Sequence, residues 1–98
     1  MIDVFVTQVD EDTVRLGTTI FFDNELPRVG VAELKNIVKT EVEAYTGFFA
    51  EVVVSPSNRE AHIVVYKGWD PINLGNDIQE LVVAAGYARD RIEKEAKE

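Results

Sequence analysis

Residues 13–22 read TVRLGTTIFF, and apolar and polar side chains alternate along most of this stretch. Alternation with a period of two predicts a β-strand, because successive side chains of a strand point to opposite faces. Residues 2–9, IDVFVTQV, alternate in the same way and are joined to this strand by the acidic turn at residues 10–12. We therefore expect a β-hairpin. Its second strand ends on Phe21 and Phe22, whose rings must lie on opposite faces of the sheet.

The length of the turn decides which side chains of the hairpin share a face. A three-residue turn pairs residues whose numbers have an even sum, so even-numbered residues of both strands lie together. Phe5, Val9 and Phe21 then point away from the following set: Ile2, Val4, Val6, Val14, Leu16, Ile20 and Phe22.

The rest of the chain repeats the order of strand and helix. Apolar residues at helical spacing predict a helix over residues 31–45, with Gly47 as its stop signal. A second hairpin is expected from residues 48–54 and 61–67, around a turn-rich connection, and a last helix over about residues 77–94.

These elements form two similar halves. An offset of 44 residues aligns the following apolar pairs: Pro27 with Pro71, Leu34 with Ile78, Ile37 with Leu81, and Val38 with Val82. We predict a single α+β domain over residues 1–98, with a ββαββα pseudo-repeat and a four-stranded, mainly antiparallel sheet that has two helices on one face. The alternative is a monomer with one helix on each face of the sheet.

A sheet with both helices on one face leaves its other face uncovered. One parity of the second hairpin puts Phe49, Val53, Val64 and Tyr66 on that face, and the opposite parity exchanges the two sets. Each aromatic side chain covers about 150–250 Å², which exceeds in sum what a soluble monomer exposes as one patch. We expect a second copy of the chain to cover this face, with the following dimer interface: Phe5, Phe21, Phe49, Val64 and Tyr66. The alternatives are that a different protein covers this face and that RNA bases stack on the rings.

The composition excludes several function classes. The chain has no cysteine, which excludes disulfides, thiolate zinc sites and cysteine nucleophiles. No stretch approaches the roughly 18 apolar residues of a membrane span, so we expect a soluble, cytoplasmic protein. The net charge of −8, from 18 acidic and 10 basic residues, opposes direct binding to nucleic acid.

No catalytic, cofactor or metal motif is recognisable. His62 is the only histidine and lacks a serine–histidine–acid spacing, so we interpret it as a structural or surface residue rather than a base. Glu41 falls within the apolar stripe of the first helix, where it either acts as a buried acid or reaches a basic partner. The acidic turn at residues 10–12 lacks the spacing of a calcium loop. We expect no enzyme activity, no cofactor and no metal, and Trp69 is either an interface anchor or a plug of the core.

Acidic residues concentrate in two segments, residues 1–27 and 69–88. The expected partner-binding set is Asp10, Glu11, Asp12, Asp23, Glu25, Asp70, Asp77 and Glu80. In composition and expected shape the chain resembles small acidic proteins, many of them from phages, that mimic DNA and block DNA-binding proteins. The resemblance implies an inhibitor that occupies the basic surface of a nucleoid-associated protein, nuclease or polymerase subunit. The alternative is an acidic homodimeric structural or assembly domain without mimicry.

Overall fold

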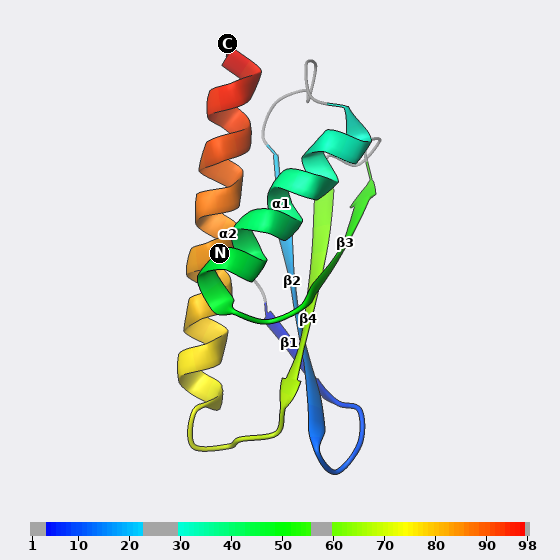
Figure 1. Cartoon of the computed structure of the whole chain (residues 1–98), viewed down its shortest axis with the longest axis vertical. Helices are drawn as coiled ribbons and strands as arrows, with labels where there is room; N and C mark the ends of the chain where they lie inside the picture. Colours follow the sequence, from blue (N-terminus) through cyan, green and yellow to red (C-terminus); the bar gives the residue numbers. More distant parts are fainter. Residues whose placement is uncertain (1–3, 23–29, 56–59, 98) are drawn as a thin grey trace.

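A computed structural model of the chain describes residues 4–22, 30–55 and 60–97. Its elements follow one another in the predicted order (Figure 1): β1 Val4–Gln8, β2 Thr13–Phe21, α1 Val31–Thr46, β3 Ala50–Ser55, β4 Glu60–Gly68 and α2 Leu74–Lys97. The ββαββα order and the α+β class are thereby confirmed. None of the helices in these ranges combines the length and the apolar character needed to cross a membrane.

The four strands form one sheet in the order β1-β2-β4-β3, and every neighbouring pair is antiparallel. The central strands β2 and β4 each have nine residues and pair along their whole length, from Thr13 opposite Gly68 to Phe21 opposite Glu60. In the first hairpin, the Val9 amide donates to the Thr13 carbonyl oxygen at 2.9 Å. This bond closes the predicted three-residue turn.

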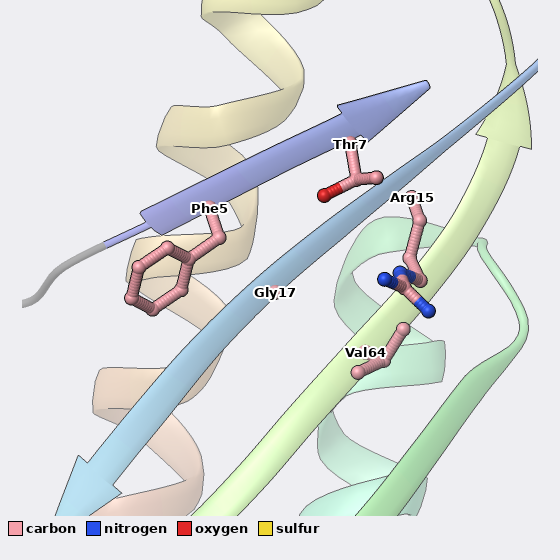
Figure 2. A pocket seen from close by; sticks show the side chains of 5 residues that line it. All are labelled: Phe5, Thr7, Arg15, Gly17 and Val64. Atoms are coloured by element: carbon pink, nitrogen blue, oxygen red, sulfur yellow. The ribbon is translucent and has the colours of Figure 1, made fainter. Parts of the chain in front are cut away.

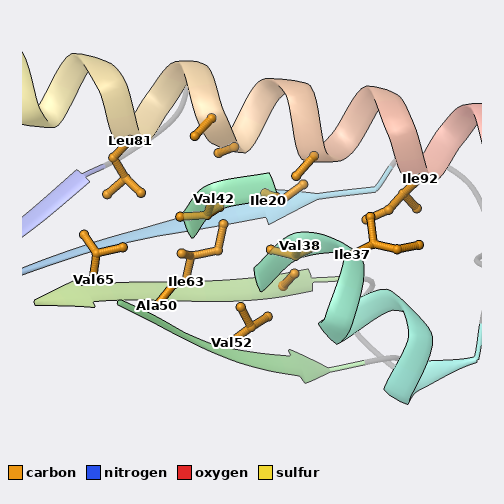
Figure 3. Packing of buried hydrophobic residues seen from close by; sticks show 14 of the residues in the cluster. Ile20, Ile37, Val38, Val42, Ala50, Val52, Ile63, Val65, Leu81 and Ile92 are labelled. Atoms are coloured by element: carbon orange, nitrogen blue, oxygen red, sulfur yellow. The ribbon is translucent and has the colours of Figure 1, made fainter. Parts of the chain in front are cut away.

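The core lies between one face of the sheet and both helices. Figure 3 shows side chains of α2 and of the strands pointing toward one another, with α1 beside them. The buried apolar residues include the following: Val14, Leu16 and Ile20 of β2, Val52 of β3, Ile63 and Val65 of β4, Leu34, Val38 and Val42 of α1, and Leu81, Ala85 and Ile92 of α2. The prediction of two helices on one face is confirmed, and the alternative of one helix on each face is wrong.

The ends of the helices follow local chemistry. Gly47 has a φ of 74° and donates its N–H to the Glu43 carbonyl oxygen at 2.9 Å, which ends α1 as predicted. Helix α2 begins at Leu74 rather than at Asp77. Asp70 causes this earlier start, because its carboxylate accepts bonds from the Ile72 amide and the Asn73 side chain and fixes the turn before the helix.

Side chains of α1 cover the beginning of the β3 edge. The Glu43 carboxylate accepts the Ala50 amide at 3.0 Å, and the Lys39 ammonium donates to the Ala50 carbonyl oxygen at 2.7 Å. Both backbone groups of Ala50 are therefore bonded to side chains. Charged side chains on an edge strand discourage the addition of another strand.

Candidate interaction surface

We call the sheet surface opposite the helices the open face. Three of its apolar side chains are more than half exposed, with 64% of Phe5, 54% of Phe21 and 64% of Val53 accessible to solvent. Their neighbours along each strand, such as Leu16 and Val52, are buried under the helices. The alternation of the strands therefore separates a covered face from an uncovered apolar one, as the sequence predicts.

The register of the strands places these residues in rows across the sheet. One row runs from Phe5 through Gly17 and Val64 to Glu51, and it crosses all four strands. In the next row Arg15 lies between Thr7 and Tyr66. Polar, charged and apolar side chains thus share the open face, and a large residue of β1 lies directly beside a glycine of β2.

A hollow of about 450 Å³ opens on this face, and Figure 2 shows its lining: Phe5, Thr7, Arg15, Gly17 and Val64. The helices lie behind the sheet in this view. Gly17 forms the floor of the hollow, because it has no side chain and its Phe5 neighbour points away from the sheet. A glycine inside a strand often marks a place where another group approaches the backbone closely.

The predicted interface residues do not all have the same surroundings. Val64 and Tyr66 are half-buried within the sheet surface. Phe49 is 60% exposed but lies at the β3 edge, where the Lys39 ammonium sits 4.1 Å from its ring centroid. Phe49 therefore belongs to the rim of the open face, and Phe5 and Val53 are its most exposed apolar residues among those described.

His62 takes part in a polar row on the open face. Its Nδ1 lies 3.1 Å from the Thr19 hydroxyl, and its Nε2 lies 3.0 Å from the Glu60 carboxylate. One neutral tautomer satisfies both contacts, with Nε2 donating to Glu60 and Nδ1 accepting from Thr19. The row lies outside the lining of the hollow. This bonding accords with the structural interpretation of His62.

Four of the predicted acidic residues lie at one end of the molecule, and we call them the acidic end: Asp10, Glu11, Asp12 and Asp70. Figure 1 shows the turn of the first hairpin and the connection from β4 to α2 at the same end. The Trp69 amide donates to the Asp12 carbonyl oxygen at 2.8 Å and joins these two segments. Asp23 and Glu25 lie outside the described residues.

Asp70 is held by its own turn. The Asn73 side-chain amide donates to its carboxylate at 2.6 Å, and the Ile72 amide donates to the other oxygen at 3.2 Å. These bonds, that of Asn73 first, lower the pKa of Asp70 below its ordinary value of 3.8. Asp70 therefore stays charged at every physiological pH.

Two predicted acidic residues lie elsewhere. Asp77 is buried in the first turn of α2, where it forms an ion pair with Lys67. Its charge is neutralised inside the protein, so Asp77 contributes no free carboxylate to a partner-binding surface. Glu80 is half-buried on the next turn of the helix. Lys67 itself points to the helix side of β4.

The remaining candidates lie on the helices and the connecting loop. Glu41 accepts a bond from Arg91 at 2.6 Å, which links α1 to α2 and agrees with the interpretation that it reaches a basic partner. Trp69 is 40% exposed, so it does not plug the core completely, and its role as an anchor stays a prediction.

In the described ranges, no three histidine, aspartate or glutamate side chains are arranged to hold a metal ion. Comparisons with protein-family models, with curated proteins and with solved structures find no match to this chain.

Proposed function

We propose that this protein is an acidic interaction domain that self-associates through the open face. One observation carries the proposal: Phe5, Phe21 and Val53 are each more than half exposed on a sheet surface whose opposite side holds both helices. Burying these side chains against a second copy would remove apolar area from water, at about 25 cal/mol per Å². A twofold contact between identical faces is also the commonest form of association.

The distribution of charge supports this mode of association. The chain carries a net charge of −8, but none of the acidic-end residues is among those that line the hollow on the open face. Two copies can therefore approach through their open faces without bringing their acidic ends into the centre of the contact. Long-range repulsion between acidic copies weakens as salt rises, so association should strengthen with ionic strength.

The test is the molar mass of the wild-type chain in solution, by sedimentation equilibrium, beside the variants Val53→Lys and Ile72→Lys. We expect the wild type to be a dimer and Val53→Lys to be a monomer, because the new charge would be buried in the contact. Ile72 is the matched control, since it is 92% exposed but lies in the connection from β4 to α2. Ile72→Lys should remain a dimer.

A second function is favoured by the acidic end. Asp10, Glu11, Asp12 and Asp70 lie together, and a dimer would present two such ends. We propose that they bind the basic surface of a DNA-binding protein and compete with DNA. This is the mimicry that the composition suggests, carried by four of the eight predicted acidic residues: Asp77 is buried, Glu80 lies elsewhere on α2, and Asp23 and Glu25 lie outside the described residues.

Competition with DNA tests this second function. A basic nucleoid-associated protein is bound to labelled duplex DNA, and the chain is added at low salt. The wild type should displace the DNA, whereas a variant with Asp10→Asn, Glu11→Gln and Asp12→Asn should displace it less and lose salt dependence. Equal displacement by both proteins would contradict mimicry and leave the self-association proposal standing.

A further inference from the structure

We infer that Arg15 of one copy pairs with Glu51 of the second copy, twice across the twofold contact, and that these two ion pairs set how the open faces align. The inference rests on the proposed function, because it requires the open faces to meet. It adds the charged residues that the expected interface of aromatic and valine side chains did not contain.

The open face carries two charged side chains that the described part of the chain leaves unpaired. Four residues of the described open face are acidic or basic: Arg15 of β2, Glu51 of β3, and Glu60 and His62 of β4. Glu60 and His62 bond to each other. Neither Arg15 nor Glu51 forms an ion pair or a side-chain hydrogen bond with the described part of the chain, and both are exposed.

When two copies meet through the open face, each of these two charges needs a partner of opposite charge. A buried charge without a partner is strongly unfavourable, and a face with one positive and one negative unpaired group can satisfy both only by matching them with each other. In a twofold contact, residue i meets residue j and residue j meets residue i. Pairing Arg15 of each copy with Glu51 of the other therefore gives all four charges a partner. The alternative alignment, Arg15 opposite Arg15 and Glu51 opposite Glu51, would bring like charges together.

The two residues are positioned for such an exchange. Arg15 lies on a central strand opposite Tyr66, and Glu51 lies on the edge strand β3 opposite Val64, in the neighbouring row. They are therefore separated along and across the sheet, so the chain does not pair them internally. A twofold axis that lies between the two sheets, runs parallel to them and passes over β4 between Tyr66 and Val64 brings Arg15 of each copy opposite Glu51 of the other.

The hollow beside Arg15 provides a place for the incoming carboxylate. The Arg15 guanidinium and the Thr7 hydroxyl both line it and supply hydrogen-bond donors, and Phe5 and Val64 form apolar walls. Gly17, which forms the floor, has no side chain that would fill the hollow (Figure 2). An arginine that meets a carboxylate between apolar walls forms a directional, charge-assisted pair. The open face is thus complementary to itself in charge as well as apolar in character.

Charge reversal tests this pairing. Arg15→Glu and Glu51→Arg are prepared separately, mixed in equal amounts, and also combined in one chain. We expect each single variant to self-associate about a hundredfold more weakly than the wild type, because both ion pairs become like-charge contacts. The mixture should form heterodimers, which native mass spectrometry distinguishes by mass, and the doubly reversed chain should regain the wild-type dissociation constant.

Two reversals away from the open face serve as controls. Lys35 of α1 and Asp90 of α2 are exposed, and Lys35→Glu and Asp90→Arg should dimerise like the wild type. Single reversals that dimerise normally, or a mixture without heterodimers, would overturn the pairing while the dimer of the wild type still supports the proposed function. A monomeric wild type would overturn both. Circular dichroism of each variant verifies that it is folded.

Discussion

Lys67 of β4 and Asp77 of α2 form a buried ion pair between the end of the sheet and the first turn of the helix, with 8% and 11% of their side chains exposed. The carboxylate also lies near the positive end of the helix dipole. Replacing Asp77 by Ala should leave a buried ammonium without a partner and lower the free energy of unfolding by about 3–5 kcal/mol. Urea denaturation measures this change.

The double variant Lys67→Met with Asp77→Leu is the informative comparison for that pair. Replacing both charges by apolar groups of similar size should restore most of the lost stability, because no buried charge is left unpaired.

The pair of Lys39 and Glu43 is half-exposed, with 36% and 32% of the side chains accessible. Breaking it through Glu43→Gln should therefore lower the free energy of unfolding by less than about 1 kcal/mol. Equal losses at both sites would contradict the difference in burial.

Two glycines should respond to alanine with opposite signs. Gly47 has a φ of 74°, a backbone conformation that opposes a Cβ atom, so Gly47→Ala should lower the free energy of unfolding by about 1–2 kcal/mol. Gly86 lies within α2, where a Cβ atom would project into open space. Gly86→Ala should therefore raise the free energy of unfolding by about 0.5–1 kcal/mol. Thermal and urea unfolding of the two variants compare the signs directly.

Asp70 should make the stability depend on acid pH. Its pKa in the folded protein is lowered below 3.8, first by the Asn73 side chain, so the unfolded chain binds the proton more readily. The stabilisation is fully present above the unfolded value and is lost as the pH falls through the folded value. Asp70→Asn should flatten this acid limb in urea titrations that extend below pH 3.8. Parallel pH profiles for both proteins would contradict this assignment.

A substitution at Gly17 should change the stability of the fold and the strength of the proposed contact in opposite directions. A Cβ atom at this position would meet the Ile63 carbonyl oxygen at 3.7 Å, an ordinary contact, so a side chain is accommodated. Gly17→Thr should raise the stability of the folded chain by about 0.5–1 kcal/mol, since glycine weakens a strand. By filling the hollow it should weaken self-association about tenfold, or ~1.4 kcal/mol. Unfolding at low protein concentration and sedimentation at high concentration measure the two effects separately. Unchanged association would exclude the hollow from the contact.

The sequence predicts the fold because alternation and helical spacing are local signals. Val14 and Leu16 lie on the covered face and Phe5 on the open one, since a period of two leaves no other arrangement once the turn has three residues. Gly47 ends the first helix for an equally local reason, its positive φ.

The site was less predictable because it depends on which strands are neighbours. The hollow requires Phe5 of β1, Gly17 of β2 and Val64 of β4 to share one row, and no single stretch of sequence contains that register. Asp77 was wrongly expected at the surface. A signal for its burial was present, since Lys67 shares its parity with Ile63 and Val65 and so points under the helices, where it needs an acidic partner.

The central claim is that the open face binds a second copy of the chain. Sedimentation equilibrium of the wild type across a range of protein and salt concentrations tests it most directly. We predict a monomer–dimer equilibrium that Val53→Lys abolishes and Ile72→Lys preserves, since only Val53 lies on the open face. A wild type that stays monomeric at the highest concentration, with Phe5 and Val53 exposed to solvent, would contradict the claim.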